Sequence, residues 1–288
     1  MRQIVVIGST GQLAGDLLRV FGAEAIGLSH QDIEVTDGLG ALLKLQSLRP
    51  DWVLNTAAFN RVDDCEINPS LAFSVNAFGA FNVARAAAAV GAGVVFFSTD
   101  YVFGGNERSR GNPYTEGDST SPVSVYGASK CGGEQLVRLG NPRHLISRTA
   151  GLYGETTSRK GWTFPELMLQ KARKEGKASV VHDQILTPTY TADLADKVKE
   201  LIDRGATGLF HLTNAGECSW FEFTRELFAM AGVAVDLAPI TTDQSQRRAR
   251  RPSYSALKSA QLQTVGVAPM RSWQEALRDY LGRKSELK

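Results

Sequence analysis

The fold is decided by residues 4–14, which read IVVIGSTGQLA. The first four residues, Ile4–Ile7, are all apolar and β-branched, which predicts a buried strand. Gly8 and Gly11 follow, and a helical pattern over Gln12–Phe21 begins at once. Glycines let a backbone approach a pyrophosphate, and a helix N-terminus offers it free N–H groups. The stretch therefore predicts a dinucleotide site, although G-x-x-G-x-x-A is weaker than G-x-G-x-x-G and simple turn chemistry stays open.

Strand-like and helix-like segments alternate through the first half of the chain. The predicted strands are Ile4–Ile7, Ala25–Leu28, Trp52–Asn55, Val94–Ser98 and Leu145–Arg148. The predicted helices are Gln12–Phe21, Gly38–Leu48, Ser70–Val90 and Ser124–Leu139. This alternation predicts an α/β fold, a doubly wound parallel Rossmann sheet with right-handed crossovers.

The alternation loosens after about Leu152, where residues 154–161 form a polar loop. The later elements that we expect are a strand at Val180-Val181, a helix over Thr191–Asp203, a strand over Gly208–Leu212, and helices over Trp220–Met230 and Trp273–Leu281. We predict a Rossmann domain over residues 1–152, with a return over about 185–214. Residues 153–184 and 215–288 are predicted to form a smaller, discontinuous α/β substrate domain.

The composition excludes several classes of protein. The chain has 288 residues, with 32 Lys and Arg against 30 Asp and Glu, and a net charge of +2 argues against a nucleic-acid partner. The 3 cysteines and 4 histidines show no ligand or disulfide spacing, so we expect reduced thiols, no metal site and a cytoplasmic location. The longest uncharged apolar stretch, Ala86–Phe97, is shorter than the roughly 18 residues of a membrane span. We therefore expect no membrane association.

Two further segments are candidates for the cofactor site. The second strand ends at Leu28-Ser29-His30, which carries neither the acid typical of NAD sites nor the arginine typical of NADP sites, so NADH and NADPH both stay open. In the next loop, Glu34 could accept from the adenine amino group and Val35 could line the ring, although a solvated loop acid is nearly as plausible. The small residues after the third strand, Asn55-Thr56-Ala57-Ala58, leave space for a ligand or for close strand–helix packing.

A tyrosine and a lysine, Tyr126 and Lys130, are spaced to share one face of a helix announced by Ser121-Pro122. A nearby cation favours the phenolate and lowers the pKa of tyrosine, so Tyr126 can exchange a proton with a carbonyl or hydroxyl group. The preceding strand ends in Ser98-Thr99-Asp100 at the same edge of the sheet. Thr99 could donate a hydrogen bond to the reacting oxygen, and Lys130 could hold the nicotinamide ribose. The alternative for the hydroxyl groups of Ser98 and Thr99 is ordinary capping of the strand end.

These motifs resemble the extended short-chain dehydrogenase/reductases, and among them the dTDP-4-dehydrorhamnose reductases. The similarity covers most of the chain and is carried by GSTGQLA (8–14), NTAAFNRVD (55–63), STDYVF (98–103), SPVSVYGASK (121–130), RTAGLYG (148–154), DQILTPTYTADLA (183–195) and RRPSYSALKSAQL (250–262). STDYVF and R-P-x-x-S-x-L are more specific than Tyr-x-x-x-Lys.

The resemblance implies hydride transfer from NADH or NADPH to the C4 carbonyl of a nucleotide-linked 4-keto-6-deoxysugar. It makes Tyr126 the proton donor, with Lys130 lowering its pKa and Thr99 tuning both. Together with the segments considered one by one, it places the cofactor on Gly8, Thr10, Gly11, Gln12, Leu13, Glu34, Val35, Ala57, Ala58, Phe59, Tyr126 and Lys130, and the substrate on Thr99, Asp100, Tyr101 and Arg251.

Two positions depart from the family pattern. Gly151 stands where members typically have a tryptophan that shapes the sugar site, and Glu34 stands where many have aspartate. A nucleotide-sugar epimerase or dehydratase is an alternative, but Thr99-Asp100-Tyr101 lacks the Asp-Glu pair common in dehydratases. A non-catalytic subunit like the regulatory subunit of methionine adenosyltransferase is another alternative, disfavoured by the retained Thr99, Tyr126 and Lys130.

Two surface features complete the expectations. Arg247, Arg248, Arg250 and Arg251 form a dense basic cluster, in which we expect Arg251 to face a substrate diphosphate and at least two of the others to be solvated. The Ala/Phe-rich helix Leu71–Val90 and the helix of Tyr126 could pair in a homodimer, or could simply cover the sheet.

Overall fold

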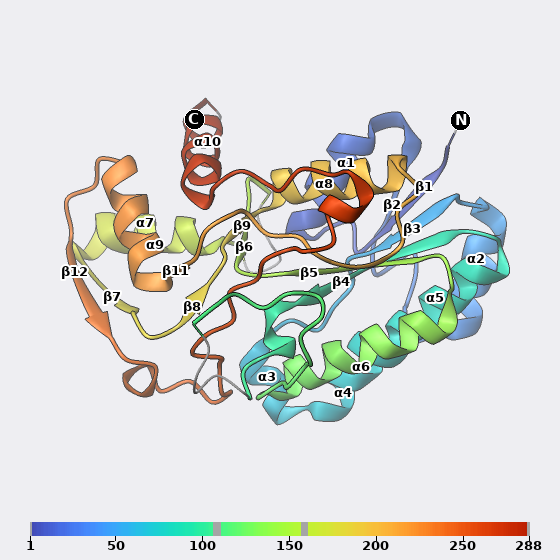
Figure 1. Cartoon of the computed structure of the whole chain (residues 1–288), viewed down its shortest axis with the longest axis horizontal. Helices are drawn as coiled ribbons and strands as arrows, with labels where there is room; N and C mark the ends of the chain where they lie inside the picture. Colours follow the sequence, from blue (N-terminus) through green and yellow to red (C-terminus); the bar gives the residue numbers. More distant parts are fainter. Residues whose placement is uncertain (1, 106–110, 157–160, 287–288) are drawn as a thin grey trace.

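A six-stranded parallel sheet forms the centre of the molecule, in the order β10-β5-β4-β3-β1-β2 (Figure 1). The computed structural model describes residues 2–105, 111–156 and 161–286. The strands are β1 (Ile4–Ile7), β2 (Ala25–Leu28), β3 (Trp52–Asn55), β4 (Gly93–Thr99), β5 (His144–Thr149) and β10 (Gly208–His211). The predicted doubly wound Rossmann sheet is confirmed, with β4 and β5 each one residue longer at both ends than the sequence pattern indicated.

Helices cover both faces of this sheet. On one face lie α1 (Gln12–Phe21) and α8 (Thr191–Asp203), and on the other lie α2 (Gly38–Leu48), α5 (Ala80–Ala89) and α6 (Val125–Gly140) (Figure 1). Each layer buries its own apolar cluster, which explains why the strands are apolar on both sides. Between β1 and β3 the direction of winding reverses. In such sheets the crevice that binds ligands lies at this switch point, beyond the carboxyl ends of the strands.

The predicted helix over residues 70–90 consists of three consecutive pieces. These are α4 (Pro69–Phe73), the π-helical turn η2 (Ser74–Gly79) and α5, and they follow the short helix α3 (Val62–Ile67). Helix α6 packs closely against η2 because it carries glycine at the contact. A Cβ atom on Gly133 would lie 2.4 Å from the carbonyl oxygen of Asn76.

The remaining elements form a smaller layer of helices and two-stranded sheets with its own apolar core. The pairs are β7 (Lys177–Val181) with β12 (Asp236–Ile240), β8 (Ile185–Leu186) with β11 (Cys218–Ser219), and β6 (Leu152–Tyr153) with β9 (Thr189–Tyr190). The helices of this layer are α7 (Phe164–Glu175), α9 (Trp220–Met230) and α10 (Trp273–Glu286). Of the short 3₁₀ turns, η1 (Gly22–Glu24) follows α1, η3 (Asp100–Val102) follows β4, η5 (Asp243–Ser245) follows β12 and η6 (Gln263–Val265) precedes α10.

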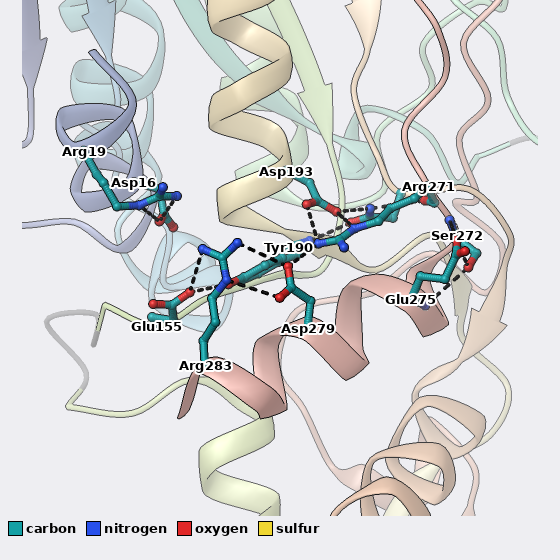
Figure 2. A network of polar contacts seen from close by, with 11 residues as sticks. Asp16, Arg19, Glu155, Tyr190, Asp193, Arg271, Ser272, Glu275, Asp279 and Arg283 are labelled. Carbon is teal, nitrogen blue, oxygen red and sulfur yellow. Dashed lines mark hydrogen bonds and ion pairs between the residues drawn. The ribbon is translucent and has the colours of Figure 1, made fainter. Parts of the chain in front are cut away.

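A network of polar contacts ties this layer to the sheet domain (Figure 2). Buried Asp16 of α1 accepts a hydrogen bond from Thr191 at the start of α8, at 2.6 Å. Arg271, just before α10, forms ion pairs with Asp193 of α8 at 2.8 Å and with Asp279 of α10 at 2.7 Å. These bonds fix α1, whose N-terminus faces the crevice, relative to both parts of the molecule.

Candidate active site

The glycine loop after β1 has the geometry of a dinucleotide site. Gly8 has a φ of +83°, and a Cβ atom there would lie 2.7 Å from Thr56 Oγ1. Only glycine fits both restrictions. The Gly8 N–H donates to the carbonyl of Leu28 at 2.8 Å, and the Gly11 N–H donates to the carbonyl of Gly8 at 2.9 Å. The Thr56 hydroxyl donates to the carbonyls of Ile7 and Gly8 at 2.7 and 3.3 Å, so backbone bonds and one side chain hold the loop.

The N-terminus of α1 is free to bind an anion. Its N-cap is Gly11, no side chain caps it, and no acidic residue lies in its first turn. Thr10 is exposed, Leu13 and Ala14 are buried, and the Gln12 amide nitrogen is buried with no partner among the described residues. The uncapped N–H groups suit a pyrophosphate, because the positive end of the helix points at it.

The segment Ala57–Phe59 lines the opposite side of the crevice. Its three side chains are half-buried, and its backbone is clamped by two buried asparagines. Asn55 Oδ1 accepts from the Ala57 N–H at 3.1 Å, and Asn76 Oδ1 accepts from the Phe59 N–H at 2.8 Å. Asn76 also donates to Ser129 Oγ of α6 at 3.0 Å, so it links the predicted adenosine side to the helix of Tyr126.

The two residues expected near adenine have protein partners already. Glu34 accepts from the N–H and the hydroxyl of Thr36, both at 2.9 Å, and pairs with His30 at 3.2 Å. The backbone bond from Thr36 holds the pKa of Glu34 below its usual range. Val35 is buried in the core beneath η2 and has little surface left for a ring.

Helix α6 brings Tyr126 to the end of β4. Ser124 caps the helix by accepting from the Gly127 N–H at 3.2 Å. A Cβ atom on Gly127 would lie 2.1 Å from the carbonyl oxygen of Tyr101, so glycine there lets η3 touch the helix. The Tyr101 and Tyr126 rings meet edge to face, with centroids 5.9 Å apart.

Tyr126 has a raised pKa in the ligand-free protein. Burial is the main cause, and the charge of Asp100 adds to it, while the nearby Thr99 hydroxyl acts in the opposite direction. The shift is opposite to the lowering expected from Lys130. Contacts in ligand-free active sites are often long and tighten only when substrate binds.

Lys130 lies one helical turn after Tyr126 and is only 2% exposed. Its Nζ lies 4.0 Å from the centre of the Phe96 ring, and within the described part of the chain no protein group accepts a hydrogen bond from it. Burial lowers its pKa to about 7, against a raising effect of Glu134. A buried ammonium with unused donors is suited to a ribose hydroxyl of a bound dinucleotide.

Thr99 and Asp100 are buried at the end of β4, against the loop that carries Ser255. Thr99 donates to Asp100 Oδ1 at 3.0 Å and accepts from the Tyr101 N–H at 3.2 Å. Ser255, from the loop that follows the basic cluster, donates to Asp100 Oδ2 at 2.6 Å. Burial raises the pKa of Asp100 to about 6.

Of the arginine cluster, Arg251 alone is largely covered, whereas Arg247, Arg248 and Arg250 are exposed as expected. Arg251 pairs with Asp63 of α3 at 3.0 Å and interacts with the Tyr101 hydroxyl. Through Tyr101 it reaches the neighbourhood of Tyr126, and the Asp63 carboxylate neutralises its charge.

The glycine at position 151 has a local explanation. Gly151 has a φ of +52°, and a Cβ atom there would lie 2.7 Å from Leu186 Cδ1 and 3.3 Å from the Trp220 ring. Leu186 and Trp220 thus fill the space into which a side chain at 151 would project.

The sequence reading missed a buried charge pair under the catalytic helix. Glu134 accepts from Arg148 at 2.8 and 2.7 Å and from Ser98 Oγ at 2.6 Å, and all three side chains are buried. The position of Glu134, four residues after Lys130, was an available signal. Asn76 offered none, because its partners are remote in sequence. Ser255 was marked only as the serine of the R-P-x-x-S-x-L pattern, which does not indicate its partner Asp100.

Other features of the described residues lie outside this site. A hollow of about 210 Å³ between α8 and the segment before α10 is lined by Asp193, Asp196, Lys197, Glu200, Pro269, Met270 and Arg271, none of them a predicted site residue. No described helix has the length and apolar character to span a membrane. Nor does that part of the chain bring together three or more His, Cys, Asp or Glu side chains that could hold a metal ion.

Comparison with known proteins agrees with this geometry. The chain is 37% identical to the spore coat polysaccharide biosynthesis protein SpsK of Bacillus subtilis, covering 99% of both chains. It is 37% identical to a dTDP-4-dehydrorhamnose reductase of Mycolicibacterium smegmatis, covering 97% of this chain and 85% of the relative. A crystal structure of dTDP-4-dehydrorhamnose reductase from Bacillus anthracis in complex with NADP superposes with a TM-score of 0.93 at 36% identity, covering 98% of this chain and 100% of that one. Residues 1–285 match the family described as the RmlD substrate binding domain, and the chain belongs to that family.

Proposed function

We propose that this protein is an NAD(P)H-dependent reductase of the C4 carbonyl of a nucleotide-linked 4-keto-6-deoxysugar, most similar to dTDP-4-dehydrorhamnose reductase. The observation that supports the proposal is that Thr99 lies beside Tyr126 at the end of β4, with Lys130 one helical turn further along α6 and an uncapped glycine loop after β1. Two relatives that are 37% identical over nearly the whole chain are dTDP-4-dehydrorhamnose reductases.

The residues present fit a nicotinamide dinucleotide. The free N–H groups of α1 suit its pyrophosphate, and Lys130 has unused donors for its ribose. When bound, the reduced cofactor supplies the hydride. Tyr126 then donates its proton to the carbonyl oxygen, and a charged Lys130 stabilises the phenolate that remains. NADPH is our first choice, because a related structure contains NADP and the two residues directly after β2, Ser29 and His30, are not acidic. The next acid, Asp32, already accepts from the N–H and the hydroxyl of Ser29.

We place the substrate on the second-domain side of Tyr126. Tyr101 and Arg251 border that side, and a guanidinium suits the diphosphate of a sugar nucleotide. Asp63 and the Ala249 carbonyl engage part of the Arg251 guanidinium at 3.0–3.3 Å, which orients it toward the catalytic residues.

We also propose that two copies pair through the face formed by α4, η2 and α6. Leu71, Phe78 and Leu139 are exposed on these neighbouring helices, at 40%, 58% and 79%. Burying them would remove apolar surface from water. Sedimentation should show a dimer at micromolar concentration that Phe78→Ser or Leu139→Ser weakens, and a wild-type monomer would end this proposal.

The decisive experiment mixes the protein with NADPH and a panel of dTDP- and UDP-linked 4-keto-6-deoxysugars and follows the loss of NADPH absorbance. Stoichiometric oxidation with formation of the 4-hydroxy sugar supports the reductase. Sugar conversion without net NADPH consumption indicates the epimerase or dehydratase alternative. Binding of NADPH without turnover of any sugar favours a non-catalytic subunit.

A further inference from the structure

Asp100 is a buried carboxylate at the reaction centre that the proposed chemistry leaves unused. It is 3% exposed, and both its oxygens accept bonds from hydroxyl groups, Oδ1 from Thr99 and Oδ2 from Ser255. Protein hydroxyl groups thus engage both oxygens. This geometry suggests that Asp100 acts through Thr99 rather than by touching the sugar.

The hydrogen bonds of Thr99 show how this action works. A hydroxyl group has one proton to donate and two lone pairs that accept. While Asp100 is ionised, Thr99 gives it that proton and accepts from the Tyr101 N–H, which leaves only a lone pair for the reaction centre. A protonated Asp100 can instead donate to Thr99, and the Thr99 proton is then free.

Ser255 decides which carboxyl oxygen takes the proton. Because Ser255 donates to Oδ2 at 2.6 Å, Oδ1 is the oxygen left for a proton, and Oδ1 faces Thr99. The other groups nearby are Tyr101, Tyr126 and the ion pair of Arg251 with Asp63. The tyrosines are uncharged near neutral pH and the ion pair is internally compensated, so Asp100 and Lys130 are the groups of the site whose charge changes there.

Reduction of a ketone builds negative charge on the carbonyl oxygen, and hydrogen-bond donors aimed at that oxygen stabilise the transition state. We propose that Asp100 is a positioning residue for reduction, whose neutral form turns the Thr99 hydroxyl toward the reacting oxygen as a second donor beside Tyr126. The proposal rests on the proposed function. An ionised Asp100 withdraws this donor and also makes Tyr126 a weaker acid, since its charge raises the pKa of Tyr126.

The test compares kcat/KM for reduction as a function of pH in the wild type and in Asp100→Asn. The amide is neutral at every pH and its NH₂ group can donate to Thr99. The ratio of variant to wild type should therefore rise about tenfold as pH increases through the Asp100 pKa of about 6, where the wild type loses its second donor. Deprotonation of Lys130 affects both proteins and cancels in the ratio. Asp236→Asn, the same change on exposed β12, is the matched control and should show a constant ratio.

Thr99→Val separates the proposed route from a direct effect of charge. In that background Asp100→Asn should leave only the small rise that comes from the charge of Asp100 acting on Tyr126, because no hydroxyl remains to be turned. A ratio that rises as steeply as in the Thr99-containing protein would show that Asp100 acts on Tyr126 through space alone, and a ratio that is constant or falls in the Thr99-containing protein would show that the neutral form is not the productive one. Either result overturns the proposal.

A second measurement needs no substrate. In ligand-free protein with ¹³C-labelled aspartate, the carboxyl resonance that Asp100→Asn removes should titrate near 6 and move to higher pH in both Ser255→Ala and Thr99→Val, because each loses a donor to the ionised form. A wild type that reduces no 4-keto sugar would refute the proposed function. If the pKa of Asp100 is the same in Thr99→Val as in the wild type, the proposed coupling between Asp100 and Thr99 is refuted.

Discussion

The cofactor side and the substrate side of the active site are built in different ways. The cofactor side consists of the glycine loop and the segment after β3, held chiefly by backbone contacts between neighbouring parallel strands. The substrate side depends on side chains far apart in sequence, since 188 residues separate Asp63 from Arg251 and 155 separate Asp100 from Ser255. The first kind of site can be recognised in a short motif, whereas the second exists only once the domains have met.

The largest effect should come from a change at Tyr126, which tests whether catalysis and cofactor binding can be separated. Tyr126→Phe removes the proton donor and little else, so we expect kcat for reduction to fall by about 10²–10⁴-fold while NADPH affinity stays within about twofold. Steady-state rates and fluorescence titration of NADPH measure the two quantities. Wild-type turnover by the variant would show that another group donates the proton.

Two glycines of α6 give a matched comparison of stability. Gly127→Ala places a Cβ atom 2.1 Å from the Tyr101 carbonyl oxygen, so η3 must move away from the helix. We expect a loss of about 2–4 kcal/mol in the free energy of unfolding, with lower activity.

Gly132→Ala is the control, because its nearest neighbours would lie at 3.7 Å. The better helix propensity of alanine should stabilise it by up to about 1 kcal/mol. Urea unfolding measures both variants, and equal effects would contradict the close approach at Gly127.

On the substrate side, Arg251→Ala should raise the KM for the sugar nucleotide about ten- to hundredfold, the equivalent of about 1.5–3 kcal/mol, and leave NADPH affinity unchanged. Arg248→Ala, at an exposed position in the same cluster, is the control and should have little effect. If the KM of Arg251→Ala stays at the wild-type value, the arginine only holds Asp63.

The smallest expected effect is the uptake of a proton when the dinucleotide binds. The pKa of Lys130 is lowered to about 7 in the ligand-free protein, so near pH 8 much of it is neutral. Dinucleotide binding favours the ammonium, so binding should take up a proton above about pH 7, and affinity should fall as pH rises.

Calorimetry in buffers of different ionisation enthalpy measures this uptake. Lys130→Met should abolish it, together with much of the affinity and activity. Uptake that survives in the variant would have to come from another group.

Much of the fold and part of the site could be predicted from the sequence. The six strands of the central sheet and the helices α1, α2, α6 and α8 lie at or close to the predicted residues, because apolar runs and glycine turns are local properties. The π-helical turn with Asn76 was not predicted, since its geometry depends on the close contact of Gly133 in α6.

By itself, the sequence determined the glycine loop, the Tyr126–Lys130 pair and the strand that ends in Thr99, because each depends on the spacing of a few neighbouring residues. Only the tertiary structure decided what surrounds them. Burial lowers the pKa of Lys130 and raises that of Asp100. Ser255, 155 positions later in the chain, donates a hydrogen bond to the Asp100 carboxylate. Desolvation and long-range hydrogen bonds arise from packing, and packing leaves no pattern in a stretch of consecutive residues.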